Sequence, residues 1–296
     1  MSSEFAEEIS PGSVIPVFDP STEEQIAESI EGGQIAVDEA VARARQAVSD
    51  GVWSRKPAAE RSRILWALAG LLESRADELA VIDARNVGMS VMHARNLTLA
   101  SAELVRYAAG WCTKILGTSN DLRSVGGITG QAAQFHCYTI KEPVGVVAQI
   151  VPWNGPVYNA IAKLAPALAA GCCCVLKPAE ETPLSALKLL ELIHEAGVPE
   201  GVVNIVTGYG HTTGAALAAH PDVDKIAFTG STEVGKKIVQ AASGNLKKVM
   251  LELGGKSPYI VFDDADLDSA VEGLVDAIWF NQGQVCCAGS RLLVQE

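Results

Sequence analysis

The feature that most constrains the fold of this chain is a regular alternation of short apolar runs and helical segments, which starts after Pro143. The apolar runs cover residues 144–150, 172–176, 202–206, 225–228 and 249–251, and the helical segments between them cover residues 157–169, 183–196, 212–219 and 232–242. This alternation is typical of parallel strands joined by right-handed helical crossovers. We therefore expect an α/β fold built on an open, doubly wound parallel sheet. Ligands of such sheets bind beyond the carboxyl ends of the strands, so the residues after each run are the candidates for a site.

The part of the chain before Pro143 has a different pattern. Apolar residues recur at helical spacing between about residue 35 and residue 116, with charged residues on the outer faces. Residues 122–142 are rich in glycine at first and then alternate between apolar and polar side chains. This second stretch predicts an exposed β-hairpin or arm.

Charge and cysteine content argue against several kinds of partner. The formal net charge of -12, without a basic stripe, argues against nucleic acid and against an anionic membrane surface. The acidic N-terminus has no apolar core, so we expect no signal peptide, and the longest apolar run is too short to span a bilayer. The seven cysteines show neither CxxC nor Cys/His ligand spacing, which predicts no metal site and favours a reducing compartment. We therefore expect a cytoplasmic protein.

Polar side chains follow the first two predicted strands. Asn154 either points its amide into the cleft or is a turn residue between two prolines. Lys177 and Glu180 follow the second strand, where a carboxylate can bind the hydroxyls of an adenosine ribose. The alternative is a solvated ion pair beside a helix that Thr182 caps and that has Pro183 in its first turn.

The next two strand ends are rich in glycine and small residues. Gly208, Gly210 and Gly214 form a GxGxxxG pattern, one residue off the GxGxxG dinucleotide fingerprint, which lets backbone approach a ligand closely. Gly230 and Ser231 open a helix whose N–H groups could face a pyrophosphate. Each signal is modest alone, but their recurrence at successive strand ends predicts one dinucleotide lying along the sheet.

A thiol and a carboxylate occupy two further junctions. Cys286 lies among glycines and glutamines, which suits a reactive thiolate better than a small core residue. Cys287 is adjacent, and local sequence does not separate the two thiols. Glu252 ends an apolar strand before two glycines, where apolar surroundings would favour a general base; alternatively it pairs with Lys256 or a helix N-terminus. Such a thiol and carboxylate are the two groups needed to form and then hydrolyse a thioester.

Together these segments resemble the aldehyde dehydrogenase superfamily, of the NAD-dependent, hydrolytic type. The motifs occur in the family's order as PWN (152–154), KPAE (177–180), FTGSTEVG (228–235), LELGGK (251–256) and QGQVC (282–286), and the resemblance extends from about Pro16 onward. It implies a Rossmann-like dinucleotide-binding domain with N-terminal helices, a β-hairpin oligomerisation arm and the start of a second α/β catalytic domain. The implied boundaries are 1–121 for the N-terminal helical part, 122–142 for the arm, 143–252 for the dinucleotide-binding domain and 253–296 for the start of the catalytic domain.

The resemblance also implies a role for each motif residue. It makes Cys286 the nucleophile rather than Cys287, because the family's thiol follows Gly-Gln-x. The Asn154 amide and the Cys286 backbone N–H would stabilise the oxyanion, and Glu252 would activate the water that hydrolyses the thioester. Members that pass the acyl group to coenzyme A generally lack this glutamate. The residues implied to bind the cofactor are Ile150, Pro152, Trp153, Lys177, Glu180, Gly210, Gly214, Phe228, Gly230, Ser231, Leu253 and Gly254.

The implied activity is oxidation of a small-molecule aldehyde to a carboxylic acid with NAD, and NADP is possible although Glu180 would repel its 2'-phosphate. The resemblance implies a homodimer or homotetramer for the full-length protein. Because family members extend far beyond the thiol, we expect the N-terminal part of such an enzyme, in which residues 290–296 form a strand without neighbours. The alternative is a short, non-catalytic chain that binds a dinucleotide or a partner. Retention of Cys286, Asn154 and Glu252 together favours the enzyme.

Overall fold

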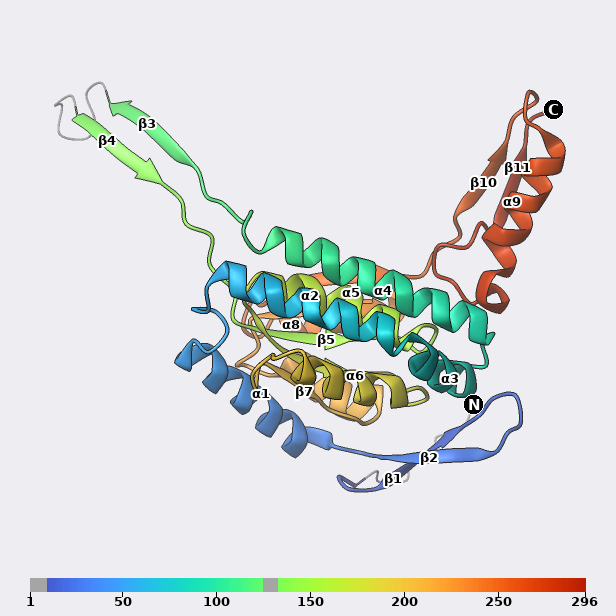
Figure 1. Ribbon diagram of the computed structural model, residues 1–296, viewed down its shortest axis with the longest axis horizontal. Helices are drawn as coiled ribbons and strands as arrows, with labels where there is room; N and C mark the ends of the chain where they lie inside the picture. The colour runs from blue at the N-terminus through green and yellow to red at the C-terminus, as the bar shows by residue number, and fades with distance from the viewer. Residues whose placement is uncertain (1–9, 125–132) are drawn as a thin grey trace.

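The computed structural model describes residues 10–124 and 133–296. At its centre is a five-stranded parallel sheet with the strand order β7-β6-β5-β8-β9 (Figure 1). These strands are β5 (Val146–Ile150), β6 (Cys173–Lys177), β7 (Val203–Ile205), β8 (Lys225–Gly230) and β9 (Lys248–Leu253). Each lies at one of the five predicted apolar runs, so the expected doubly wound α/β fold is confirmed.

Helices cover both faces of this sheet. On one face α5 (Pro156–Ala169) and α6 (Leu184–Glu195) pack against the strands, backed by α2 (Ala58–Ser74), α3 (Ala76–Val87) and α4 (Val91–Trp111). On the other face α1 (Gly33–Asp50) and α8 (Thr232–Ala242) contact the strands, with α7 (Ala215–Ala219) packed between them. Because right-handed crossovers lead first from β5 to β7 and then back to β8, the strand order reverses between β5 and β8, where sheets of this kind bind ligands.

The hydrophobic core lies between the sheet and these helices. Every residue of β5 and β6 is buried, as expected for parallel strands covered on both faces. Trp53, from the turn after α1, is fully buried, and its indole N–H donates to the carbonyl oxygen of Leu168 at 2.9 Å. None of the helices in residues 10–124 and 133–296 is long and apolar enough to cross a membrane.

Two helix boundaries differ from the sequence prediction. The segment predicted as a helix over 212–219 begins as a π-helical turn, η1 (Gly210–Gly214), and continues as α7. α6 begins at Leu184, with Pro183 at its N-cap and without a side-chain cap, so the predicted cap by Thr182 is wrong. The Thr182 hydroxyl is instead buried.

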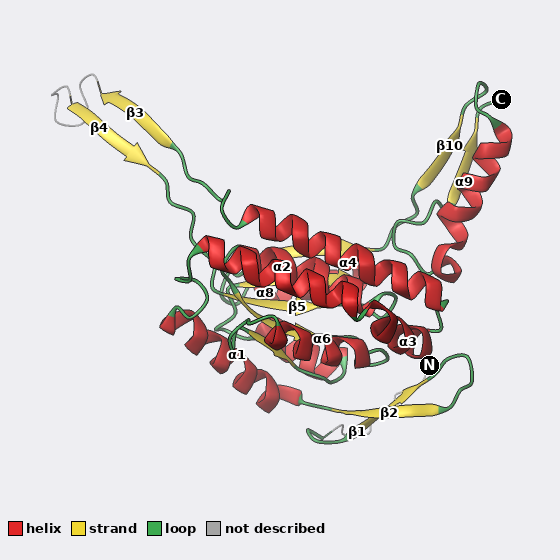
Figure 2. Cartoon of the chain, in the orientation of Figure 1, coloured by secondary structure: helices red, strands yellow, loops and turns green. Residues whose placement is uncertain are grey.

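Two antiparallel hairpins lie outside the central sheet. The first pairs β1 (Val14–Phe18) with β2 (Gln25–Ile30). The sequence pattern did not predict this hairpin, because Pro16 interrupts the first strand. The second pairs β3 (Ser119–Ser124) with β4 (Ala133–Tyr138) and projects away from the helices (Figure 2). The predicted arm is therefore a hairpin that starts slightly earlier than expected, while its glycine-rich stretch 125–132 lies outside the described residues.

The last part of the chain forms a small β-α-β unit that projects at the opposite end of the molecule (Figure 1). β10 (Pro258–Val261) pairs in parallel with β11 (Arg291–Val294), and α9 (Leu267–Trp279) connects them. The expectation that residues 290–296 form a strand without neighbours is therefore wrong for one edge of β11. That edge pairs with β10, which the sequence pattern did not indicate as a strand. A short 3-10 turn, η2 (Phe280–Gly283), follows α9 and leads to the two adjacent thiols.

Candidate active site

A largely apolar cavity of about 370 Å³ opens near the carboxyl ends of β5 and β8. Four of the residues predicted to bind a cofactor line it, namely Ile150, Gly210, Gly214 and Phe228. The rest of its wall comes from η1, α7 and α8. The cavity therefore lies where the strand order reverses, and its apolar, glycine-containing wall suits a flat aromatic group.

Lys177, Glu180 and Gly210 form a hydrogen-bonded network beside this cavity. The Lys177 side chain is 2% exposed and its ammonium donates to the Glu180 carboxylate at 2.8 Å. Glu180 also accepts from the Gly210 backbone N–H at 3.1 Å. Burial raises the pKa of Glu180, but the Lys177 charge and the hydrogen bonds outweigh it and lower that pKa below its ordinary value. The alternative of a solvated pair is therefore wrong for Lys177, and Glu180 is an oriented, charged acceptor.

The N-terminus of α8 lies between β8 and β9. Ser231 caps it, since its hydroxyl accepts from the Val234 N–H at 3.2 Å. Gly230 allows a close turn, because a Cβ there would lie 2.5 Å from the Phe228 ring. Leu253 packs against α8, where a Cβ on Gly235 would approach it to 2.8 Å. These contacts bring the start of α8 next to the end of β9. A helix N-terminus of this kind can bind an anionic group.

Asn154 and the loop that carries the thiols are in direct contact. The Asn154 side chain is half-buried and its amide donates to the carbonyl oxygen of Gln284 at 2.7 Å. Asn281 donates back to the Asn154 carbonyl oxygen at 2.9 Å. Cys286 and Cys287 are both exposed, and the Cys286 carbonyl oxygen lies 3.6 Å from the Cβ position of Gly255. The structure thus brings the predicted amide and thiol loop together, while exposure alone does not separate the two cysteines.

Three predicted residues lie at the edges of this arrangement. Pro152 is half-buried, and Trp153 is exposed at the wall of a separate cavity that Gln284 also lines. Gly254 is exposed, with no atoms within 4 Å of its Cβ position. The structure therefore leaves these three positions outside the 370 Å³ cavity.

Glu252 lies on β9, opposite Thr229 of β8, and its side chain is exposed. The apolar surroundings predicted for it are therefore wrong. Its charged neighbour is Lys163 of α5, which the sequence reasoning missed. Burial lowers the pKa of the Lys163 ammonium to about 8, an effect that the Glu252 charge opposes and the Lys225 charge enhances. The available signal was that Lys163 is the one charged residue in the predicted helix 157–169.

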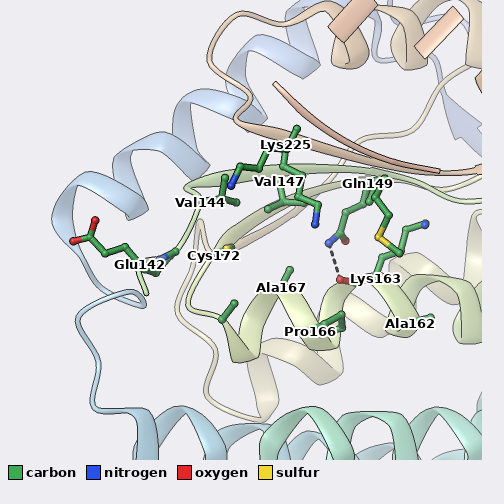
Figure 3. Close-up of a pocket in the computed structure, with 15 residues that line it drawn as sticks. Glu142, Val144, Val147, Gln149, Ala162, Lys163, Pro166, Ala167, Cys172 and Lys225 are labelled. Atoms are coloured by element: carbon green, nitrogen blue, oxygen red, sulfur yellow. Dashed lines mark hydrogen bonds between the residues drawn. The ribbon is translucent and has the colours of Figure 1, made fainter. Parts of the chain in front are cut away.

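Lys163 also lines a second cavity, of about 380 Å³, between α5 and the sheet (Figure 3). Lys225 and Lys248 contribute two further ammonium groups to its wall. The Gln149 amide donates to the Lys163 carbonyl oxygen at 2.9 Å, while its own side-chain oxygen is buried without a partner in the structure. The wall of this cavity therefore carries three lysines and one carboxylate, Glu142.

A buried carboxylate that the sequence reasoning missed holds the glycine-rich turn after β7. Glu31 is 1% exposed and accepts from the backbone N–H groups of Gly33 and Tyr209, at 3.0 and 2.7 Å. It also accepts from the hydroxyls of Thr212 and Thr213, at 2.9 and 2.6 Å. Burial raises its pKa, but these hydrogen bonds together lower it. Glu31 thereby joins the start of α1 to the turn that lines the apolar cavity.

Comparison with known proteins agrees with this geometry. A sequence model described as "Aldehyde dehydrogenase family" matches residues 5–296. Aldehyde dehydrogenase 1A1 of Oryctolagus cuniculus is 50% identical over 288 residues, which cover 96% of this chain and 56% of that protein. The NAD+ complex of aldehyde dehydrogenase from Bacillus cereus superposes with a TM-score of 0.91 at 44% identity, again over 96% of this chain and 56% of that one. PnpE in complex with nicotinamide adenine dinucleotide gives a TM-score of 0.90 at 45% identity, with the same coverage.

The chain therefore spans a little over half the length of the relatives it matches, at 56% for the rabbit protein and 58% for the aldehyde dehydrogenase of Enchytraeus buchholzi. Over that length the match includes the whole parallel sheet and the thiol loop, since the family model covers residues 5–296. The chain belongs to the aldehyde dehydrogenase family.

Proposed function

We propose that this chain is the cofactor-binding and thiol-bearing part of an enzyme that oxidises an aldehyde to a carboxylic acid with NAD. The observation that carries this function is the 2.7 Å hydrogen bond from the Asn154 amide to the Gln284 carbonyl oxygen. It places an amide donor next to a loop with two exposed thiols. Family membership supports the same reaction class, as does the NAD+ complex of the Bacillus cereus relative.

The proposed reaction begins at Cys286. Its thiolate attacks the aldehyde carbon, so that a C–S bond forms and the carbonyl electron pair moves to oxygen. The second N–H of the Asn154 amide and the backbone N–H of Cys286 stabilise that oxyanion. NAD, when bound, accepts the hydride that leaves the carbon, and a thioester on Cys286 remains. Glu252 removes a proton from water, which attacks the thioester and releases the carboxylic acid and the thiol.

The residues around the apolar cavity fit NAD. Glu180 is a charged acceptor held by a buried lysine and suits the hydroxyls of a ribose, while it would repel the 2'-phosphate of NADP. The N-terminus of α8, with Ser231 and Gly230, suits a pyrophosphate. The apolar cavity of about 370 Å³ suits the adenine ring. Pro152, Trp153, Leu253 and Gly254 complete the proposed set.

The proposed role of Lys163 is electrostatic. Its ammonium lies within interaction range of Glu252, so it places a positive charge near the group proposed to activate water. This charge would assist the hydrolytic half of the proposed reaction.

Domain limits, assembly and location are proposals of the same kind. We assign residues 1–121, 143–252 and 253–296 to the N-terminal, dinucleotide-binding and catalytic parts, and residues 122–142 to the arm. The projecting hairpin β3–β4 would pair with another copy of the protein in a homodimer or homotetramer. A cytoplasmic location agrees with the free cysteines of the described residues.

The decisive experiment measures NAD binding and NADH formation with the same protein. Tryptophan fluorescence reports NAD binding, and absorbance of NADH reports turnover after a benzaldehyde or propanal addition. Aldehyde-dependent NADH formation supports the proposed enzyme. Binding of NAD without NADH formation supports a non-catalytic dinucleotide-binding chain instead, and absence of NAD binding contradicts both functions.

A further inference from the structure

We propose that Asn281 is a positioning residue for the thiol of Cys286, a role that rests on the proposed function of that thiol. Asn281 lies in the turn η2, five positions before Cys286, and its side chain is 3% exposed. It does not reach the thiol itself. It acts through a closed ring of hydrogen bonds between the thiol loop and the Asn154 turn.

Four hydrogen bonds form this ring. The Asn281 side-chain amide donates to the Asn154 carbonyl oxygen at 2.9 Å. The Asn154 side-chain amide donates to the Gln284 carbonyl oxygen at 2.7 Å. The Gln284 backbone N–H donates to the Asn281 carbonyl oxygen at 3.0 Å, and its side-chain amide donates to the same oxygen at 3.1 Å. Loss of the Asn281 or the Asn154 side-chain bond opens the ring.

The backbone of this loop is held in a conformation that needs such support. Asn281 and Gln282 have φ of 49° and 57°, and Gly283 has φ of 77°, so three consecutive residues are left-handed. Glycine adopts this conformation without strain and asparagine tolerates it, whereas for glutamine it is costly. Such strain persists only where the surroundings hold it in place. The Asn281 side chain supplies part of this hold through its bond to Asn154, and the Gln282 side-chain amide adds a bond to the Gly88 carbonyl oxygen at 3.2 Å.

The ring therefore fixes the position of the Cys286 thiol relative to the Asn154 amide, which is proposed to stabilise the oxyanion. Gln284, which accepts from the Asn154 amide, lies two residues before Cys286 in the chain. A shift of the loop by about 1 Å can cost about 100-fold in rate at a reacting centre. Asn281 thus contributes to catalysis by fixing geometry, without contact to the aldehyde.

The test uses acylation of Cys286 by 4-nitrophenyl acetate, which needs no NAD. The thiolate forms a C–S bond to the acetyl carbon, the C–O bond breaks and 4-nitrophenolate leaves, so its absorbance and the mass of the acetylated peptide report the rate and the site. The variants are Asn281→Gly, Asn154→Ala and the double variant. Glycine suits the left-handed backbone of residue 281 and removes only the side-chain bond. Asn245→Gly is the matched control, because Asn245 also donates to two backbone carbonyl oxygens, at 2.7 and 3.0 Å, away from the site.

We expect Asn281→Gly to slow Cys286 acylation about tenfold or more. The same variant should show faster amide hydrogen exchange in residues 281–287. Its Kd for NAD and its melting temperature should be close to those of Asn245→Gly. The double variant should lose no more than the larger single loss, because both changes open the same ring. An unchanged acylation rate in Asn281→Gly, or losses that multiply in the double variant, would overturn the positioning role. A wild-type protein without acylation at Cys286 would refute the proposed thiol chemistry, and hydrogen exchange unchanged by Asn281→Gly would separately refute the ring.

Discussion

The side-chain amide of Asn154 donates a 2.7 Å hydrogen bond to the carbonyl oxygen of Gln284, 130 residues later in the chain. This bond joins the end of β5 to the loop after α9, and so connects the central sheet with the β-α-β unit that carries both thiols. Each proposed step needs groups from both parts.

The buried pair of Lys177 and Glu180 leads to a prediction for NAD binding. Lys177→Met leaves the half-buried Glu180 carboxylate without its cation, so the acceptor for the ribose loses its orientation. We expect the Kd for NAD to rise about tenfold, equivalent to about 1.4 kcal/mol. Quenching of tryptophan fluorescence by NAD measures it.

Lys188→Met is the matched control for that change. Lys188 also donates to a glutamate three residues ahead, Glu191, at 2.8 Å, but this pair lies on the surface of α6. The Kd for NAD should remain at the wild-type value in this variant. Equal Kd values for both variants would mean that the Lys177–Glu180 pair has no part in the cofactor site.

Lys163 leads to a prediction for stability against pH. Its folded-state pKa of about 8 lies below its ordinary value near 10.5, so the unfolded chain binds the extra proton between these two values. The contribution of Lys163 to the free energy of unfolding is therefore most unfavourable below about pH 8 and rises as the pH increases toward 10.5.

Lys163→Met removes this titration while keeping similar volume. The variant should be more stable than wild type in urea unfolding at pH 7, and the difference should shrink steadily toward pH 10.5. Comparing the two proteins at each pH cancels the titration of other groups. A difference that does not change with pH would show that the Lys163 ammonium has its ordinary pKa in the folded protein.

Glu31 leads to a prediction for stability in the acidic range, where its contribution to the free energy of unfolding also rises with pH. Glu31→Gln replaces one carboxylate oxygen by an N–H₂ group. At this site, which is 1% exposed, that group faces N–H and O–H donors whose hydrogen bonds the carboxylate accepts. We expect a loss of about 1–3 kcal/mol in the free energy of unfolding at pH 7, measured by urea unfolding. Because its folded-state pKa is lowered, the wild-type advantage is complete above the ordinary value of 4.5 and is lost as the pH falls through the folded-state pKa.

Glu28→Gln is the control, since Glu28 lies on β2, three residues before Glu31, and is exposed. Its effect on the free energy of unfolding should stay within about 0.5 kcal/mol. The Glu31 variant should also bind NAD more weakly than this control, because Glu31 holds the turn that contains Gly210. Equal stability of the two variants at pH 7 would contradict a structural role for the Glu31 hydrogen bonds.

Much of the fold could be predicted from the sequence, because it depends on local patterns. The apolar runs and helical segments after Pro143 place all five strands, and covered parallel strands need continuous apolar residues. β10 was missed because it is short and half-exposed, and β1 was missed because Pro16 interrupts it. Short exposed strands leave a weak pattern, and only their partner strands identify them.

The candidate site could be predicted only in part, because its contacts join distant segments. Lys177 and Glu180 are close in sequence, so their pairing was among the predicted alternatives. The ring between Asn154 and Gln284 spans 130 residues, and the contact of Glu31 with Thr213 spans 182. No local pattern encodes such distances, and the exposure of Glu252 likewise depends on what lies against β9.

We propose that Cys286 forms a thioester and that Glu252 activates the water that hydrolyses it. The most direct measurement is the mass of the protein after it is mixed with NAD and an aldehyde and quenched in acid, for wild type and for Glu252→Gln, Cys286→Ser and Cys287→Ser. We expect Glu252→Gln to accumulate an acyl group on Cys286, with steady NADH formation slowed about 100-fold or more. Cys287→Ser should resemble wild type, and Cys286→Ser should show neither acyl group nor NADH formation. An acyl group on Cys287, or NADH formation that survives in Cys286→Ser, would contradict the account.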